Sequence, residues 1–183
     1  LQMTLDCVPV IFQGEEIGME DVAIPTEKQQ DIFVDKLRDP ARTPMQWDDS
    51  PNAGFIKEGG RPWLPVGPHY KERNVKKQLN DPKSMLTLYK KLLAFRKQQL
   101  VPARPLVIDV HNERVLAYTR ITKDDKRTLI LLNFSENSEA IDTRSLDILT
   151  GKLFFTTSLD KNQEAIDLKN FVLSPKEGYI YLL

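Results

Sequence analysis

Seven prolines between residues 25 and 68 set the strongest limit on what this chain can fold into. They stand at positions 25, 40, 44, 51, 62, 65 and 68. Proline lacks a backbone N–H and breaks helical and strand periods, and no period is sustained from Met19 to Arg73. A connection this long inside a compact protein is uncommon and usually functional. We therefore predict a long functional loop over this region.

Regular structure is predicted on both sides of the loop. Val8–Phe12 is almost wholly apolar and ends at Gly14, which is typical of a strand buried on both faces in a parallel sheet. Asp81 is a good N-cap and Pro82 suits the first helical position, so a helix is expected from there to about Gln98, before Pro102. Its apolar face is formed by Met85, Leu88, Tyr89, Leu92 and Phe95.

Beyond residue 100 the pattern changes to short β-rich runs separated by turns. The runs are 106–110, 115–120, 128–134, 152–157 and 178–182, with weaker candidates at 165–168 and 171–173. The turns are expected at 112–113, 124–125, 150–151 and 161–162. Many short strands at regular spacing predict an antiparallel sandwich or barrel. We place the boundary between an α/β part, residues 1–99, and an all-β domain, residues 100–183.

Composition excludes several classes of partner. The chain has 26 Lys and Arg against 26 Asp and Glu, so nothing favours nucleic acid or an anionic membrane surface. No apolar run is long enough for a membrane span, and no His/Cys cluster has the spacing of a metal site. No cofactor is expected. The single cysteine, Cys7, excludes an internal disulfide, fits a reducing compartment, and is predicted to be a small core residue.

Two arginines are the candidate site residues. Arg38 and Arg42 lie four positions apart, close to the apolar Met45 and Trp47. Arginine is costly to bury and offers a rigid fork of donors, so this setting suggests the polar wall of a pocket. The alternative is a pair of surface ion pairs, the commoner outcome for arginine.

Several motifs in order resemble the α-amylase superfamily. Residues 14–19, Gly-Glu-Glu-Ile-Gly-Met, are similar to the end of that family's eighth barrel strand. Residues 38–48 with 52–55, then 62–66, 74–75 and 81–97, resemble its α-glucosidase and oligo-1,6-glucosidase branch, which includes the related trehalose synthases. Beyond residue 100 the likeness is architectural, although Leu132-Asn133-Phe134 is typical of the family's C-terminal β-domain.

The resemblance implies the C-terminal end of a (β/α)₈ barrel followed by an antiparallel β-sandwich. It implies retaining cleavage of α-glucosides by a carboxylate nucleophile, a carboxylic acid that protonates the leaving oxygen, and a third carboxylate that binds the sugar. In the family these three lie on strands four, five and seven, so all would precede Leu1. We therefore expect a C-terminal portion of a longer enzyme, no catalytic residue among these 183, and no activity from the chain alone.

Two substrate-binding positions carry over from the family. Arg42 matches the arginine that pairs with an upstream aspartate at the closed end of the glucose pocket, where the pair reads the terminal 4-hydroxyl. In this chain we expect Arg42 to lack that partner. Arg38 matches a mobile arginine nearer the pocket mouth. The chain departs from the family at Asp6-Cys7, where a Pro-Gly pair is usual, and in the segment 25–38, which is several residues short.

Other residues have competing interpretations. Glu15 and Glu16 are adjacent, and adjacent residues of a strand point to opposite faces, so they do not form a catalytic pair. We predict a structural hydrogen-bonding role for Glu16 and leave Glu15 open. Trp47 and Trp63 would either stack on sugar rings or anchor the loop in the core, and we favour the anchor.

Two other functions remain as alternatives. One is a non-enzymatic relative, such as the heavy chain of an amino-acid transporter, which shares the barrel but can lack the carboxylates. The other is a carbohydrate-binding β-domain that uses exposed aromatic residues, with candidates Phe154, Phe155, Phe171, Tyr179 and Tyr181. A cytoplasmic location is our preference over an extracellular one, and the sequence leaves the oligomeric state open.

Overall fold

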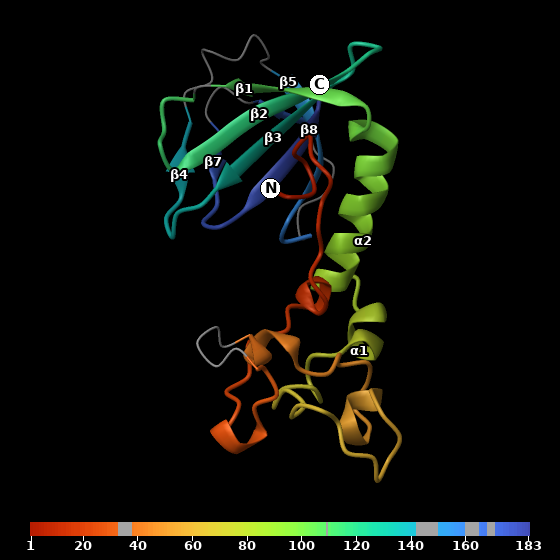
Figure 1. The fold of residues 1–183 in the computed structure, drawn as a ribbon. Coiled ribbons are helices and arrows are strands. Elements are labelled where there is room, and N and C mark those ends of the chain that lie inside the picture. Colours follow the sequence, from red (N-terminus) through yellow and green to blue (C-terminus); the bar gives the residue numbers. More distant parts are fainter. Residues whose placement is uncertain (33–37, 109, 142–149, 160–164, 168–170) are drawn as a thin grey trace. The chain divides into compact units, whose positions relative to one another are not determined.

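The computed structural model describes the chain except for residues 33–37, 109, 142–149, 160–164 and 168–170 (Figure 1). Its contacts divide it into two compact units. One unit, here the loop unit, is Val10–Lys90. The other, here the sheet unit, combines Leu1–Pro9 with Lys91–Leu183. The predicted boundary near residue 100 between a barrel part and a β-domain stays a prediction.

The sheet unit contains a six-stranded antiparallel sheet in the order β1-β2-β3-β8-β5-β6 (Figure 1). Its strands are β1 (Ala103–Ile108), β2 (Val115–Thr122), β3 (Arg127–Asn133), β5 (Thr150–Thr156), β6 (Ala165–Asp167) and β8 (Gly178–Leu182). The last strand of the chain, β8, lies between β3 and β5. β4 (Glu139–Ala140) and β7 (Val172–Leu173) form a separate two-stranded sheet.

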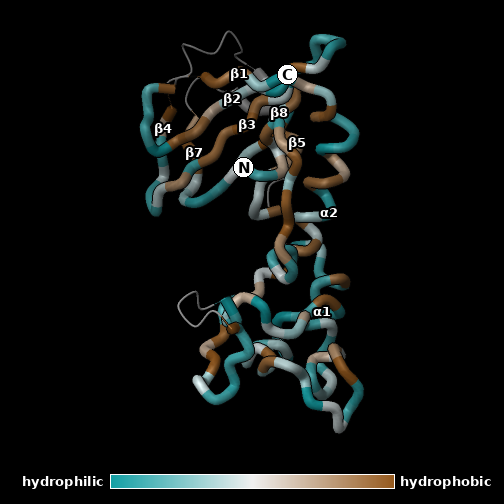
Figure 2. Tube along the Cα trace, in the orientation of Figure 1, coloured by the Kyte–Doolittle hydropathy of each residue, from teal (hydrophilic) through white to brown (hydrophobic). Residues whose placement is uncertain are grey.

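The strands of the sheet are apolar because their side chains form the core of this unit. Figure 2 shows hydrophobic residues along β2 and β3. Strand side chains alternate between faces, and one face of β3 and β8 contributes Leu129 and Leu131 paired with Tyr181 and Tyr179. Residues beside both strands of the small sheet, including Ile141, complete this cluster. The opposite face is buried too. Because both faces are buried, each central strand is a near-continuous apolar run. The sandwich stays a prediction.

The opposite face of the sheet is covered by segments without strand structure. The ring of Phe95, at the end of α2 (Met85–Phe95), lies with its centroid 4.7 Å from that of Phe154 and 6.1 Å from that of Phe155. The hydroxyls of Thr4 and Tyr118 are hydrogen-bonded to each other. Residues 1–9 and the end of the helix therefore pack as part of the sheet unit.

Two arginines hold residues 1–9 in place within that unit. The side chain of Arg120 on β2 is fully buried and donates to the carbonyl oxygens of Thr4 (2.8 Å), Leu100 (3.0 Å) and Ala103. Its guanidinium also pairs with Asp6 at 3.0 Å. Arg96 donates to three further carbonyl oxygens, those of Met3, Leu5 and Cys7. A segment outside helices and sheets does not satisfy all of its own backbone carbonyl oxygens, so these arginine side chains supply donors for them.

The loop unit has little regular structure, as the prolines predict. Short 3₁₀ helices at Glu15–Ile17, Thr26–Lys28, Asp39–Arg42 and Pro51–Gly54 precede α1 (Val75–Leu79) and the first part of α2. Hydrophobic and hydrophilic residues alternate irregularly along it in Figure 2.

The predicted strand at Val8–Phe12 is wrong. These residues form no strand, and the exposed fractions of Val8 and Val10 are 86% and 77%. A buried parallel strand needs a hydrogen-bonded neighbour on each side, and no described segment supplies one here. The same exposure extends to Cys7, which is not the core residue that we predicted.

The helix prediction is confirmed for α2, but its start is wrong. The carboxylate of Asp81 accepts from the N–H of Lys83 within the preceding turn, and Ser84 caps the helix by accepting from the N–H of Thr87 at 3.2 Å. After Phe95 the helix continues as a π-helix, Arg96–Leu100. The short helix α1 was not predicted, although its N-cap Asn74, which accepts from the N–H of Lys77 at 2.9 Å, is a recognisable signal.

Most strand predictions beyond residue 100 are confirmed. β8 has the predicted bounds, and β1, β2, β3 and β5 are each shifted or extended by a few residues. The predicted turn at 150–151 is wrong because these residues begin β5 and pair with β6. The short β4 was missed. The predicted turn at 161–162 and the end of the 165–168 run lie outside the described residues.

Glu139 on β4 gives the sheet unit a pH-dependent contact. Its carboxylate accepts from Asn112 (2.9 Å), Ser135 (2.8 Å) and Arg114 (3.3 Å). These bonds, that from Asn112 first, lower the pKa of Glu139 below its ordinary value of 4.5. A lowered folded-state pKa means that the stabilisation is present above the ordinary pKa and is lost as pH falls through the lowered one.

We expect Glu139→Gln to lower the thermal unfolding midpoint at pH 7 and to have a much smaller effect at an acid pH below the lowered pKa of Glu139, where both side chains are neutral. Glu113→Gln, at an exposed position nearby, is the matched control. Midpoints measured by circular dichroism at both pH values test this. An equal deficit at the two pH values would contradict the role of the charge.

Candidate functional site

The two candidate arginines lie at the ends of one short turn. Arg38 immediately precedes the 3₁₀ helix Asp39–Arg42, and Pro40 lies in the helix's first turn, where its missing N–H costs no helical hydrogen bond. The turn brings the arginines toward a common neighbour, Asp31. The structure therefore joins the two residues that the sequence analysis singled out.

Asp31 binds both guanidinium groups with one carboxylate. Arg38 forms a bidentate pair with it, from Nε to Oδ2 at 2.6 Å and from Nη2 to Oδ1 at 2.7 Å. Arg42 donates from Nη2 to Oδ2 of Asp31 at 2.7 Å. The Asp31 side chain is 6% exposed. Its hydrogen bonds raise the pKa of Arg38, so this guanidinium stays charged.

Asp39 holds the backbone around Asp31 in place. Asp39 is buried, and its Oδ2 accepts from the backbone N–H groups of Gln30 (2.6 Å) and Asp31 (2.9 Å). Its Oδ1 accepts from Nη2 of Arg42 at 3.2 Å. Asp39 thus fixes the backbone that carries Asp31. We call Asp31, Arg38, Asp39 and Arg42 the arginine–aspartate cluster.

This cluster gives Arg42 two partners that the sequence did not predict. Both Asp31 and Asp39 bind it, and the absence of the family's upstream aspartate stays a prediction. Asp39 carries a recognisable signal, since residues three apart meet on a helical turn. Asp31 carries none, because its approach to Arg42 depends on the path of an irregular loop. The side chains of Arg38 and Arg42 remain 46% and 34% exposed, so both can still meet a ligand.

Arg42 also lines an open pocket of about 330 Å³ in the loop unit. The pocket is lined by Phe12, Gln13, Ala41, Arg42, Thr43, Pro44, Phe55 and Trp63. Its aromatic residues Phe12, Phe55 and Trp63 are 55%, 41% and 48% exposed. Among the described residues, Nη1 of Arg42 has no hydrogen-bond partner. The pocket thus combines charged donors with apolar ring surface, which suits a ligand with hydroxyl groups and a hydrophobic face.

The tryptophans are not the core anchors that we favoured. Trp47 is 50% exposed, and Trp63 lines the pocket with 48% of its surface exposed. Burial of the loop unit instead relies on smaller groups such as Met45 and Leu64.

Glu15 and Glu16 stand on a 3₁₀ helix, so the strand argument against a catalytic pair does not apply to them. Their hydrogen bonds supply a better one. Glu16 accepts from the N–H of Gly14 and Glu15 from that of Phe12, each at 2.9 Å. The structural role predicted for Glu16 is confirmed, and Glu15 has a similar role.

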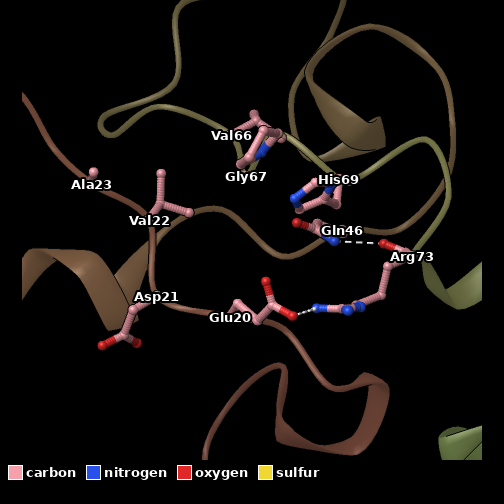
Figure 3. A pocket seen from close by; sticks show the side chains of 10 residues that line it. Glu20, Asp21, Val22, Ala23, Gln46, Val66, Gly67, His69 and Arg73 are labelled. Carbon is pink, nitrogen blue, oxygen red and sulfur yellow. Dashed lines mark hydrogen bonds and ion pairs between the residues drawn. The ribbon is translucent and has the colours of Figure 1, made fainter.

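A second pocket, of about 390 Å³, lies elsewhere in the loop unit (Figure 3). Glu20 and Arg73 face each other across it and pair at 2.8 Å, and this hydrogen bond lowers the pKa of Glu20. The amide of Gln46 donates to the carbonyl oxygen of Arg73, with His69 beside it. The carboxylate of Glu20 is therefore held in an ion pair.

Two kinds of site are not found in the described part of the chain. It contains no group of three or more metal-ligating side chains. It also contains no helix that is long and apolar enough to cross a membrane.

Comparisons with known proteins agree on one family. The model of the α-amylase catalytic domain matches residues 1–103. The oligo-1,6-glucosidase of Parageobacillus thermoglucosidasius is 38% identical over 94% of this chain and 35% of its own length. The salivary α-glucosidase of Aedes aegypti is 35% identical over 97% of this chain and 33% of its own.

Solved structures give the same result. The trehalulose synthase MutB from Pseudomonas mesoacidophila MX-45 superposes with a TM-score of 0.82 at 31% identity, over 99% of this chain and 36% of MutB. A MutB mutant in complex with its substrate sucrose superposes with a TM-score of 0.83 at 30% identity. The chain thus spans about a third of the length of the proteins that it matches.

Proposed function

Because the chain belongs to the α-amylase family, in its α-glucosidase and oligo-1,6-glucosidase branch, we propose that it forms part of a retaining α-glucosidase-type enzyme. The proposed substrate is the terminal glucose of an α-glucoside or oligosaccharide. The family's catalytic domain is a (β/α)₈ barrel. We further propose that residues 1–99 complete such a barrel and that residues 100–183 form a sandwich domain beside it.

The observation that carries this proposal is the pocket at Arg42. It offers guanidinium donors next to three exposed aromatic rings, and a sugar presents hydroxyl groups and an apolar face to such a surface. In the proposed reaction, Arg42 binds a hydroxyl of the terminal glucose and Arg38 contacts the sugar nearer the pocket mouth. The nucleophile, the acid and the third carboxylate would come from the part of the enzyme ahead of Leu1.

The carbohydrate-binding alternative loses its main support. Four of its aromatic candidates lie in or against the core: Tyr179, Tyr181 and Phe155 are buried, and Phe171 packs against the same cluster. The transporter-like alternative has no observation in its favour, since the relatives described above are enzymes.

An exposed free cysteine, Cys7, is compatible with the cytoplasmic location that we propose over an extracellular one.

The test is an assay of the full-length protein that contains this chain. We expect it to hydrolyse p-nitrophenyl α-D-glucopyranoside and to release glucose as the α-anomer, detected by proton NMR at early times. The 183-residue chain alone is expected to be inactive. Release of the β-anomer would refute retention, and turnover by the isolated chain would refute the assignment of the catalytic groups to the upstream part.

A further inference from the structure

The charge balance of the arginine–aspartate cluster bears on the class of sugar that the site accepts. Two guanidinium groups and two carboxylates lie in direct contact, with N–O distances between 2.6 and 3.2 Å. Their charges sum to zero. The carboxylates are nearly buried while the guanidinium groups are partly exposed. A ligand at this site therefore contacts arginine donors whose positive charge is already balanced by the nearly buried carboxylates.

Asp31 has a special place in this balance. It contacts both arginines, whereas Asp39, among the described arginines, binds Arg42 and accepts from two backbone N–H groups with its other oxygen. Removing the charge of Asp31 would leave Arg38 without this bidentate partner and would give the cluster a net charge of +1. Its planar carboxylate also fixes the orientation of each guanidinium, because the bonds to Arg38 are bidentate.

We propose that Asp31 is a positioning residue that orients Arg38 and Arg42 and, by neutralising them, makes the site select uncharged sugars over phosphorylated sugars. A guanidinium without a counter-ion binds phosphate strongly through paired hydrogen bonds. With Asp31 in place, that attraction is offset by a carboxylate in direct contact with both guanidinium groups. The inference rests on the proposed function, since it assumes that sugar binds at Arg42.

The test compares binding of glucose and glucose 6-phosphate to the full-length protein by calorimetry, which requires no turnover. The unaltered protein should prefer glucose. Asp31→Asn should shift the ratio of the two dissociation constants by about tenfold toward glucose 6-phosphate, as expected for one unit charge at a partly solvated site. Asp31→Glu should keep the preference, because the charge is retained. Asp21→Asn, at an exposed aspartate of the same unit, is the control.

Each outcome separates this inference from the proposed function. An unchanged ratio in Asp31→Asn would overturn the inference, even if the protein is an active glucosidase. A stronger affinity of the unaltered protein for glucose 6-phosphate would overturn it as well. A shifted ratio in a protein without glucosidase activity would support the role of Asp31 while the proposed reaction fails. A loss of folding alone would lower both affinities together and leave the ratio unmoved, which counts against the inference.

Discussion

Replacing Arg42 by lysine in the full-length protein is expected to lower kcat/KM for small α-glucosides about 100-fold. Arg42 bonds to Asp31, to Asp39 and to the carbonyl oxygen of Arg38 with one planar group. Lysine carries a point charge that cannot hold these partners and a sugar hydroxyl in fixed directions. Loss of one charge-assisted hydrogen bond costs about 1.5–3 kcal/mol, which corresponds to roughly a 10- to 100-fold change in rate.

The matched control is Arg61→Lys, an exposed arginine of the same unit outside the cluster. It should leave kcat/KM within about twofold, as is usual for exposed substitutions. Both variants are assayed with p-nitrophenyl α-D-glucopyranoside, and their unfolding midpoints are compared. Equal kinetics in the two variants would contradict the assignment of Arg42 to the sugar pocket.

A large loss of stability is expected from Arg120→Met in the sheet unit. This side chain is fully buried and donates to the carbonyl oxygens of Thr4, Leu100 and Ala103. Methionine keeps much of the volume but leaves these acceptors without a donor, and each unsatisfied buried group costs about 1–3 kcal/mol. We expect the free energy of unfolding to fall by about 3–5 kcal/mol, a large share of the stability of an ordinary domain.

Arg127→Met is the control, since Arg127 is 46% exposed and pairs only loosely with Asp125 at 3.5 Å. Urea unfolding followed by near-ultraviolet circular dichroism suits this test, because the core contains stacked tyrosines at 179 and 181. Should both variants unfold at the same urea concentration, the buried guanidinium would contribute no more than a surface one.

The sequence predicted the parts of the fold that depend on local pattern. β3 and β8 were predicted because their apolar residues are contiguous and turn signals bound them. α2 was predicted because its apolar residues recur at helical spacing. Residues 8–12 carry an equally clear apolar signal, yet they form no strand, because a strand also depends on neighbours that a local pattern does not contain.

The candidate site was predicted only in part for a related reason. Arg38 and Arg42 were found by their spacing and by a family resemblance. Asp31 contacts both only because an irregular, proline-broken segment returns toward the turn at Asp39, and no spacing rule describes such a path. Trp63 was named as a residue that would either stack on a sugar or anchor the loop, and its place in the pocket lining depends on the same irregular loop.

The attachment of residues 1–9 has a consequence for how this protein can be divided. Arg96 and Arg120 bind backbone carbonyls of that opening segment, which precedes the sheet by about ninety residues of chain. A gene cut at residue 100 would part Arg120 from its acceptor Thr4, and it would also remove Arg96 and the opening segment from the strands that they pack against. The β-region is therefore not an interchangeable module, and fusion or shuffling between relatives should succeed only when both pieces are inherited together.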